Sequence, residues 1–172
     1  IKEGGTEQMF DMLRKNEADI VFTLDRHIYD SDFIICAEQE EQVHFIAAAD
    51  NSVTDCSWKL SEISQNEFVL TEQAMSYRKI LNEILASQSL EIRPVLEIGN
   101  PLQICELVKN SSLLSFLPDF ISEKYVKDGQ IKRLDVDGCP VTVWTQLLLH
   151  KNKWRSPAIN VFIEFYKEVM QR

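Results

Sequence analysis

The chain of 172 residues is 45% hydrophobic and 26% charged, which is typical of a folded protein with a hydrophobic core. Its 27 acidic and 18 basic residues give a formal net charge of −9, so we expect this chain alone to bind neither nucleic acid nor an anionic membrane. Because it has no run of about 18 apolar residues, the sequence predicts no membrane-spanning helix.

The cysteines indicate a reducing compartment. Cys36, Cys56, Cys105 and Cys139 lie far apart and form neither a CxxC pair nor a dense disulfide framework. Cys36 and Cys105 stand in apolar surroundings, where reduced core cysteines are expected. No basic and apolar signal segment opens the chain. We therefore expect a cytoplasmic protein without disulfides.

Helix-like and strand-like segments alternate along the chain. Thr6 follows two glycines as a capping residue, and apolar residues then recur at helical spacing as far as Lys15. Similar apolar stripes predict helices at residues 60–63, 76–85, 104–108, 120–126 and 156–169. Runs rich in branched and aromatic residues predict strands at residues 1–3 (the end of a strand), 20–24, 33–36, 43–49, 68–71, 94–98, 113–117 and 143–149.

The pattern of these segments predicts an α/β fold. The apolar run at 20–24 is typical of a buried parallel strand, and an acidic bend at 38–42 separates the next two strands. Residues 143–149 form the longest strand candidate. Strands that alternate with helices predict parallel sheets covered by helices.

Three predicted helix starts lie where α/β proteins bind ligands. In parallel sheets, ligands bind at the carboxyl ends of strands, where helix starts present free N–H groups. The three starts are Gly5–Thr6, Ser76–Tyr77–Arg78 and Gly99–Asn100. Ser76 can cap its helix, and Arg78, which we expect off the core face, can offer a bidentate fork to a carboxylate. The alternative is that Ser76 is only an N-cap and Arg78 only a solvated first-turn residue.

The sequence predicts no catalytic residue, no metal site and no cofactor. His27, His44 and His150 have no metal-ligand spacing to one another or to a cysteine. No nucleophile elbow, phosphate-binding loop or dinucleotide-binding turn occurs. The cluster Glu38, Glu40 and Glu41 could supply acid–base carboxylates, but a solvated bend is the favoured interpretation.

Four segments, in this order, resemble the effector-binding region of LysR-type transcriptional regulators. They are IKEGGTEQMFDMLRKNEADIVFTL, FVLTEQAMSYRKILNEIL, LEIGNPLQICELVKNSSLLSFLP and KNKWRSPAINVFIEFYKEV. They are similar to the family's glycine–threonine turn with its helix and strand, its cleft-crossing segment, its strand–helix–strand ending in Leu-Pro, and its closing Ser-Pro helix.

The resemblance implies a periplasmic-binding-protein type 2 fold, with two α/β subdomains joined by two crossover strands. One subdomain would hold residues 1–47 and 142–172, and the other residues 48–141. A small effector, expected to be anionic, would bind between them. The family positions that line this cleft match Thr6, Ser76, Tyr77, Arg78, Asn100 and Glu41, so that the segment at Ser76 would face Thr6.

The resemblance also implies partners. In the family, effector binding changes how a homo-oligomer presents winged helix-turn-helix domains to DNA, so DNA would be bound only through a domain absent from this chain. The family region usually begins with a further strand and helix, which we expect to be missing here. Ser111 and Leu113 stand where the family often has glycines, which affects the loop there.

Two other functions compete with this interpretation. The first is a solute-binding protein of a transport system with the same fold, which should carry a secretion signal or a lipid anchor. The second is an enzyme, such as a dehydratase, on a related two-lobed fold. The lack of a nucleophile–base pair or metal set disfavours the enzyme.

Overall fold

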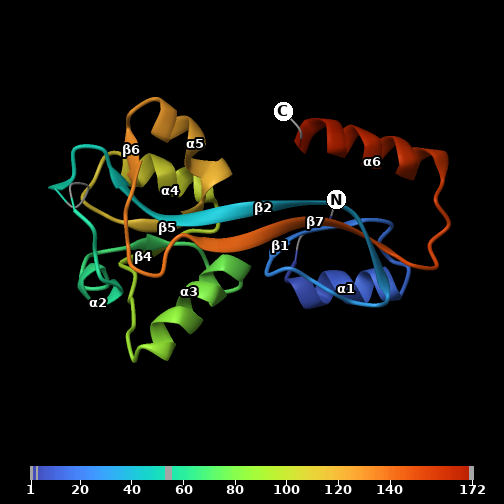
Figure 1. The fold of residues 1–172 in the computed structure, drawn as a ribbon, viewed down its shortest axis with the longest axis horizontal. Coiled ribbons are helices and arrows are strands. Elements are labelled where there is room, and N and C mark those ends of the chain that lie inside the picture. The colour runs from blue at the N-terminus through green and yellow to red at the C-terminus, as the bar shows by residue number, and fades with distance from the viewer. Residues whose placement is uncertain (1, 3, 53–55, 171–172) are drawn as a thin grey trace. The chain divides into compact units, whose positions relative to one another are not determined.

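The chain forms two compact units in the computed structural model, which describes residue 2, residues 4–52 and residues 56–170 (Figure 1). Unit 1 comprises residues 1–40 and 143–172, and unit 2 comprises residues 41–142. Strands β2 (Phe33–Ala48) and β7 (Val141–His150) contribute residues to both units. The strand end predicted at residues 1–3 falls mostly outside the described residues. In the described part of the chain, no helix is long and apolar enough to span a membrane.

Unit 1 is a sheet with a helix on each face (Figure 1). Its other elements are α1 (Thr6–Arg14), β1 (Val21–Asp25) and α6 (Pro157–Met170). The strand order is β1-β7-β2, and β1 runs antiparallel to β7. Because side chains alternate along a strand, neighbouring leucines of β7 enter different cores. Leu148 packs with Phe10 and Leu13 of α1. Leu147 and Leu149 pack with Ile159 and Ile163 of α6.

In its described residues, unit 2 packs four helices and four further strands around an aromatic core. These elements are α2 (Leu60–Ile63), β3 (Val69–Leu70), α3 (Ser76–Ser87), β4 (Leu96–Glu97), α4 (Pro101–Val108), β5 (Ser115–Pro118), α5 (Asp119–Lys127) and β6 (Ile131–Arg133). Strand β2 pairs antiparallel with β5 and β6, and β3 pairs parallel with β4. Phe45 meets Phe116 at 4.9 Å and Phe68 at 5.9 Å between ring centroids, and all three side chains are buried.

The prediction of two short strands around an acidic bend is wrong. Residues 33–48 form one strand, β2, which is therefore longer than β7, the predicted longest strand. The side chains of Glu38, Gln39 and Glu40 are exposed, and the Gln39 carbonyl accepts a hydrogen bond from Thr145 Oγ1 at 3.3 Å. Acidic side chains in solvent do not prevent a strand, because strand preference depends on where each side chain points.

The prediction of parallel sheets holds for β3 and β4 but not for the longer strands. The apolar run that begins at Ile20 becomes β1, which is antiparallel to β7 and not a buried parallel strand. Its burial alternates, since Val21 and Thr23 are buried whereas Phe22 is 51% exposed. The nearly continuous apolar run gives no sign of this alternation in burial, which is set by the pairing of β1 with β7. The three-residue strand β6 was not predicted.

The two cysteines predicted to lie in the core, Cys36 and Cys105, differ in burial. Cys105 is fully buried, and burial raises its pKa to about 11. Cys36 is only partly buried, and its Sγ lies 3.9 Å from the Arg155 guanidinium. All four cysteines are free thiols in the structure.

Candidate functional site

The parallel strands β3 and β4 direct two helix starts to one edge of unit 2. Leu70 lies opposite Glu97 at the carboxyl ends of this pair. Helix α3 follows β3 in the chain, and helix α4 follows β4. Since free N–H groups and the helix dipole favour anions at helix starts, this edge is the natural place for a ligand site in unit 2.

Ser76 does not cap α3, contrary to the prediction. The N-cap residue is Met75, whose backbone is extended, and no side chain caps the helix there. Ser76 is instead the first residue of the helix and is partly exposed.

Tyr77 is a core residue of unit 2. Its side chain is only 3% exposed. Burial raises the pKa of Tyr77 to about 12, and the neighbouring Thr71 hydroxyl opposes this rise only in part. Tyr77 therefore packs with the apolar stripe of α3, and only a change in that packing would expose it to a ligand.

Arg78 is buried, which overturns both the expectation that it lies off the core face and the alternative that it is a solvated first-turn residue. Its side chain is only 4% exposed. Leu81 and Leu85, three and seven residues further along α3, are both buried as well. Residues at these spacings share one face of a helix, so Arg78 belongs to the same face as these two leucines.

The Arg78 guanidinium has fewer partners than a buried cation needs. Its NH2 nitrogen lies 3.7 Å from Glu97 Oε1, which is an ion pair longer than a hydrogen bond. Within the described residues, the buried Nε and NH1 nitrogens have no hydrogen-bond partner. Burial lowers the pKa of Arg78, and the charge of Glu97 opposes this shift. A buried charge without full hydrogen bonding is costly, and each such group in a native protein calls for an explanation.

Glu97 and Glu72 belong to this edge and were not predicted. The Glu97 side chain is 37% exposed. The Glu72 side chain lies close to Gly99. A Cβ atom added at Gly99 would be 3.0 Å from the Oε1 atom of Glu72. The available signal was the position of Glu97 at the end of a strand, two residues before Gly99 in the predicted helix start Gly99–Asn100. We refer to Glu72, Arg78 and Glu97 as the α3 edge cluster.

Asn100 has a structural role. It is the N-cap of α4, and its Oδ1 accepts a hydrogen bond from the Leu102 N–H at 3.0 Å. Pro101 at the first helical position has the φ that a helix start requires. This capping interaction accounts for Asn100 without a ligand.

Thr6 does not cap α1, contrary to the prediction, because the N-cap residue is Gly5. Thr6 is the first helical residue, and its Oγ1 donates a hydrogen bond of 2.7 Å to Asp25 Oδ2 at the end of β1. The other oxygen of Asp25 accepts from the Arg26 N–H at 2.8 Å. Thr6 therefore joins the start of α1 to the end of β1 within unit 1.

Glu41 lies on the part of β2 that belongs to unit 2. Burial raises the pKa of Glu41, and the negative charge of Asp119 raises it further. Asp119 in turn pairs with His44 Nδ1 at 2.7 Å and with Arg133 Nε at 3.0 Å. The structure thus places Glu41 beside a paired carboxylate and not in the α3 edge cluster.

Glu38 was assigned to a solvated bend, and the structure shows a partner for it. Its Oε2 lies 2.7 Å from His27 Nε2 and accepts a hydrogen bond of 3.2 Å from Gln146 Nε2. Tyr29 stacks on the His27 ring at 4.1 Å, and Trp144 meets it edge-on at 4.6 Å. Among the residues that the structure describes, no group of three or more His, Cys, Asp or Glu side chains could hold a metal ion.

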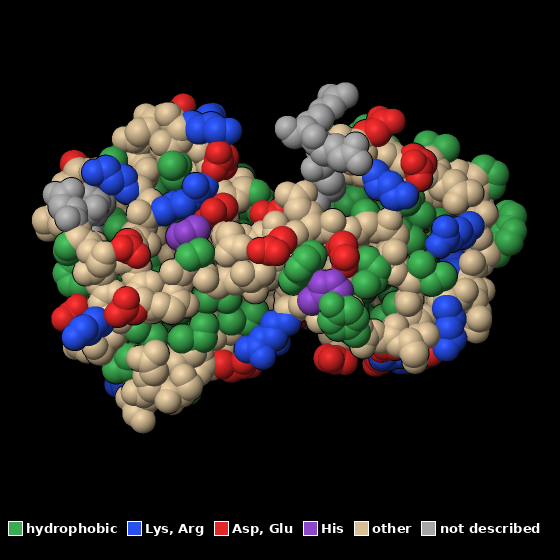
Figure 2. Space-filling model, in the orientation of Figure 1, with side chains coloured by type: hydrophobic (Ala, Val, Ile, Leu, Met, Phe, Trp, Pro, Cys, Tyr) green, Lys and Arg blue, Asp and Glu red, His purple; other side chains and the backbone are tan. Residues whose placement is uncertain are grey.

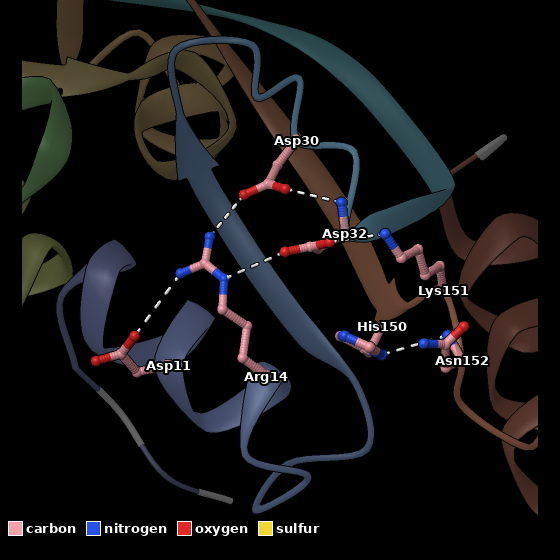
Figure 3. A network of polar contacts seen from close by, with 7 residues as sticks. All are labelled: Asp11, Arg14, Asp30, Asp32, His150, Lys151 and Asn152. Atoms are coloured by element: carbon pink, nitrogen blue, oxygen red, sulfur yellow. Dashed lines mark hydrogen bonds and ion pairs between the residues drawn. The ribbon is translucent and has the colours of Figure 1, made fainter.

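A second polar network in unit 1 is fully paired (Figure 3). Arg14 bonds Asp30 at 2.6 Å and also contacts Asp11 and Asp32. Lys151 donates to Asp32 Oδ1 at 2.8 Å, and this bond holds the pKa of Asp32 below its usual range. Both cations here, Arg14 and Lys151, have carboxylate partners. The network therefore ties α1 to the loops before β2 and after β7 and offers a ligand no unpaired cation.

The sequence matches the LysR substrate binding domain family over residues 1–171.

The chain belongs to this family.

A curated relative agrees with this assignment. The chain is 25% identical, over 167 residues, to the uncharacterized HTH-type transcriptional regulator YwqM of Bacillus subtilis. The match covers 96% of this chain and 56% of the relative, so the chain spans just over half of that protein's length.

Solved structures of LysR-type regulators have the same fold. The regulatory domain of CcmR from Synechocystis PCC6803, in complex with 2-PG, superposes with a TM-score of 0.77 at 16% identity, over 96% of this chain and 79% of that one. The effector-binding domain of QuiR in complex with shikimate gives 0.71 at 14% identity, over 94% and 76%. Full-length HypT from Salmonella typhimurium gives 0.75 at 16% identity, over 96% and 56%. The predicted type 2 periplasmic-binding-protein fold is thereby confirmed.

Proposed function

We propose that this LysR substrate-binding domain senses a small anionic effector, and that Arg78 receives the effector's oxyanion. The observation that carries the proposal is the buried Arg78 guanidinium, which has one long ion pair and two nitrogens without a hydrogen-bond partner in the described structure. A planar oxyanion can accept two parallel hydrogen bonds from a guanidinium, which a single carboxylate oxygen at 3.7 Å does not do.

The ligands of the solved relatives support a small molecule. The CcmR regulatory domain was solved with 2-PG and the QuiR domain with shikimate, which is a carboxylate. These ligands belong to those proteins, and the low identity to them leaves the effector of this chain open. The start of α3 adds helix N–H groups to the charge of Arg78, and both favour an anion.

The other residues predicted for the site have different roles in the proposal. Ser76 is partly exposed at the start of α3, two residues before Arg78, so we retain it as a ligand contact. Tyr77 is buried and Asn100 caps α4, and we assign them supporting roles. That Thr6 and Glu41 also contact the effector stays a prediction.

DNA binding by the longer protein is a further part of the proposal. The relative YwqM is named as an HTH-type regulator, and this chain spans 56% of its length. On the face seen in Figure 2, Lys and Arg side chains lie among Asp and Glu side chains, in keeping with the net charge of −9. We therefore propose that a separate winged helix-turn-helix domain of a cytoplasmic homo-oligomer binds the DNA, since phosphate binding requires a basic surface.

The alternatives fit less well. Membership of the LysR family favours a regulator over a transport-associated solute-binding protein with the same fold. The family consists of effector-binding domains of regulators and is not a known enzyme family. The His44–Asp119 pair is held by Arg133, so it is accounted for as an ion-pair network without assigning it catalysis.

A binding screen with two arginine variants tests the proposal. Shikimate, 2-PG and other small anions would be titrated into wild type, Arg78→Met and Arg93→Met, with thermal unfolding as the readout. Arg93 is the matched control, because it belongs to the same unit but is 85% exposed beside Glu91. We expect at least one anion to stabilise wild type and Arg93→Met but not Arg78→Met. Equal stabilisation of all three proteins would overturn the assignment of Arg78.

A further inference from the structure

The acidic partner of Arg78 is held loosely. Glu97 Oε1 lies 3.7 Å from the Arg78 NH2 nitrogen, beyond hydrogen-bond distance. Glu97 belongs to β4, a strand of two residues whose side chains are both exposed. The carboxylate is thus fixed neither by a hydrogen bond to Arg78 nor by burial. A partly exposed side chain of this kind can leave its position at little cost in packing.

The two residues of this ion pair, Arg78 and Glu97, differ in how firmly packing fixes their side chains. Arg78 is buried on the face of α3 that also bears Leu81, so its position is set by packing. Glu97 is 37% exposed and can turn into solvent. An oxyanion bound at Arg78 would therefore lie close to the Glu97 carboxylate, and the two negative charges would repel each other.

We propose that Glu97 is a tethered competitor for the effector: its carboxylate occupies Arg78 in the effector-free protein and is displaced by the effector's oxyanion. This inference rests on the proposed function, because it assumes that Arg78 is the anion site. The ligand class that follows is a small carboxylate or similar planar oxyanion, since it takes the place of a carboxylate. Glu97 would then set the affinity threshold of the sensor without contacting the bound effector.

The size of the effect follows from the strength of a partly exposed ion pair. Such pairs contribute about 0.2–1 kcal/mol, so release of the tethered competitor should tighten anion binding about 1.4- to fivefold. The change applies to any small oxyanion that reaches Arg78, which makes acetate a suitable probe even though the natural effector is not identified.

The experiment compares Glu97→Gln with wild type by thermal unfolding in increasing sodium acetate, against sodium chloride at equal ionic strength. Glu91→Gln is the charge-matched control, because Glu91 is 66% exposed and pairs with the exposed Arg93 of the same unit. We expect the apparent dissociation constant for acetate to fall about 1.4- to fivefold in Glu97→Gln. Glu91→Gln should bind acetate as wild type does.

The other outcomes separate the two proposals. If acetate stabilises wild type and Glu97→Gln equally, but not Arg78→Met, the anion site stands and the competition is refuted. Weaker acetate binding by Glu97→Gln would also refute the competition, because Glu97 would then support the bound anion. If acetate exceeds chloride for none of these proteins, both the anion site at Arg78 and the competition fail.

Discussion

Arg78 and Leu81 lie on the same face of α3, and both side chains are buried, at 4% and 0% exposed. A guanidinium therefore occupies a position that the helical period assigns to the core. Replacing a poorly paired buried charge with an apolar side chain of similar length is often neutral or stabilising, whereas deleting a core leucine leaves a cavity. This contrast makes the stability of Arg78 variants informative.

We predict that Arg78→Met changes the free energy of unfolding by no more than about 1 kcal/mol, or increases it, because Met fills the site without a buried charge. Leu81→Ala, the control on the same face, should lose about 2–5 kcal/mol. Urea denaturation of both variants measures this. If Arg78→Met lost as much stability as Leu81→Ala, the guanidinium would be a structural element of the core.

The buried phenol of Tyr77 predicts a specific dependence of stability on alkaline pH. Its pKa is about 12 in the folded protein against 10.0 for an unperturbed tyrosine, so folding favours the protonated form. This contribution is fully present below pH 10 and is lost as the pH rises through 12. Its size is about 2–3 kcal/mol. Urea denaturation between pH 9 and pH 12 should show wild type losing more stability than Tyr77→Phe. Parallel curves for the two proteins would contradict the burial of this hydroxyl.

The network around Arg14 predicts a change in the pKa of Asp32 (Figure 3). The hydrogen bond from Lys151 is the largest cause of the lowered Asp32 pKa. Lys151→Ala should therefore raise this pKa toward its ordinary value, which NMR titration of the Asp32 side chain would detect. Lys127→Ala, a variant in unit 2, is the control and should leave Asp32 unchanged. An unaltered Asp32 pKa in Lys151→Ala would mean that the Lys151 bond does not persist in solution.

The charge of the chain predicts its behaviour toward DNA. With a net charge of −9, this chain alone should give no gel shift with duplex DNA at physiological salt. A clear, salt-sensitive shift would show a basic surface that the interspersed charges of Figure 2 do not suggest.

The helices could be predicted from the sequence because their apolar stripes are local. Helices α1, α3 and α6 begin and end close to the predicted positions, and Ser156 caps α6 through a hydrogen bond of 3.3 Å from the Ile159 N–H. Strand pairing is not local, so the antiparallel course of β1 and the continuity of β2 were missed. The resemblance to LysR-type regulators supplied the fold, which no single segment specifies.

The candidate site was predicted only in part, for a related reason. The start of α3 was found from the sequence, but Arg78 was placed on the wrong face because the core face was defined by the apolar residues of the helix alone. Its spacing to Leu81 and Leu85 already indicated the buried face. Glu97 was missed despite its position at the end of a predicted strand, because its contact with Arg78 depends on the pairing of β3 with β4. Contacts between distant segments need the folded chain.

The measurement that tests the central claim most directly is NMR of the arginine Nε–H groups during a titration with sodium acetate at constant ionic strength. The Nε of Arg78 is buried without a hydrogen-bond partner in the described structure, so a bound oxyanion should shift its resonance strongly. Arg93, which is exposed and already paired with Glu91, serves as the internal reference. We predict a saturable shift of the Arg78 resonance and little change at Arg93. A titration that moves Arg93 or no arginine, while Arg78 stays unchanged, would contradict the account.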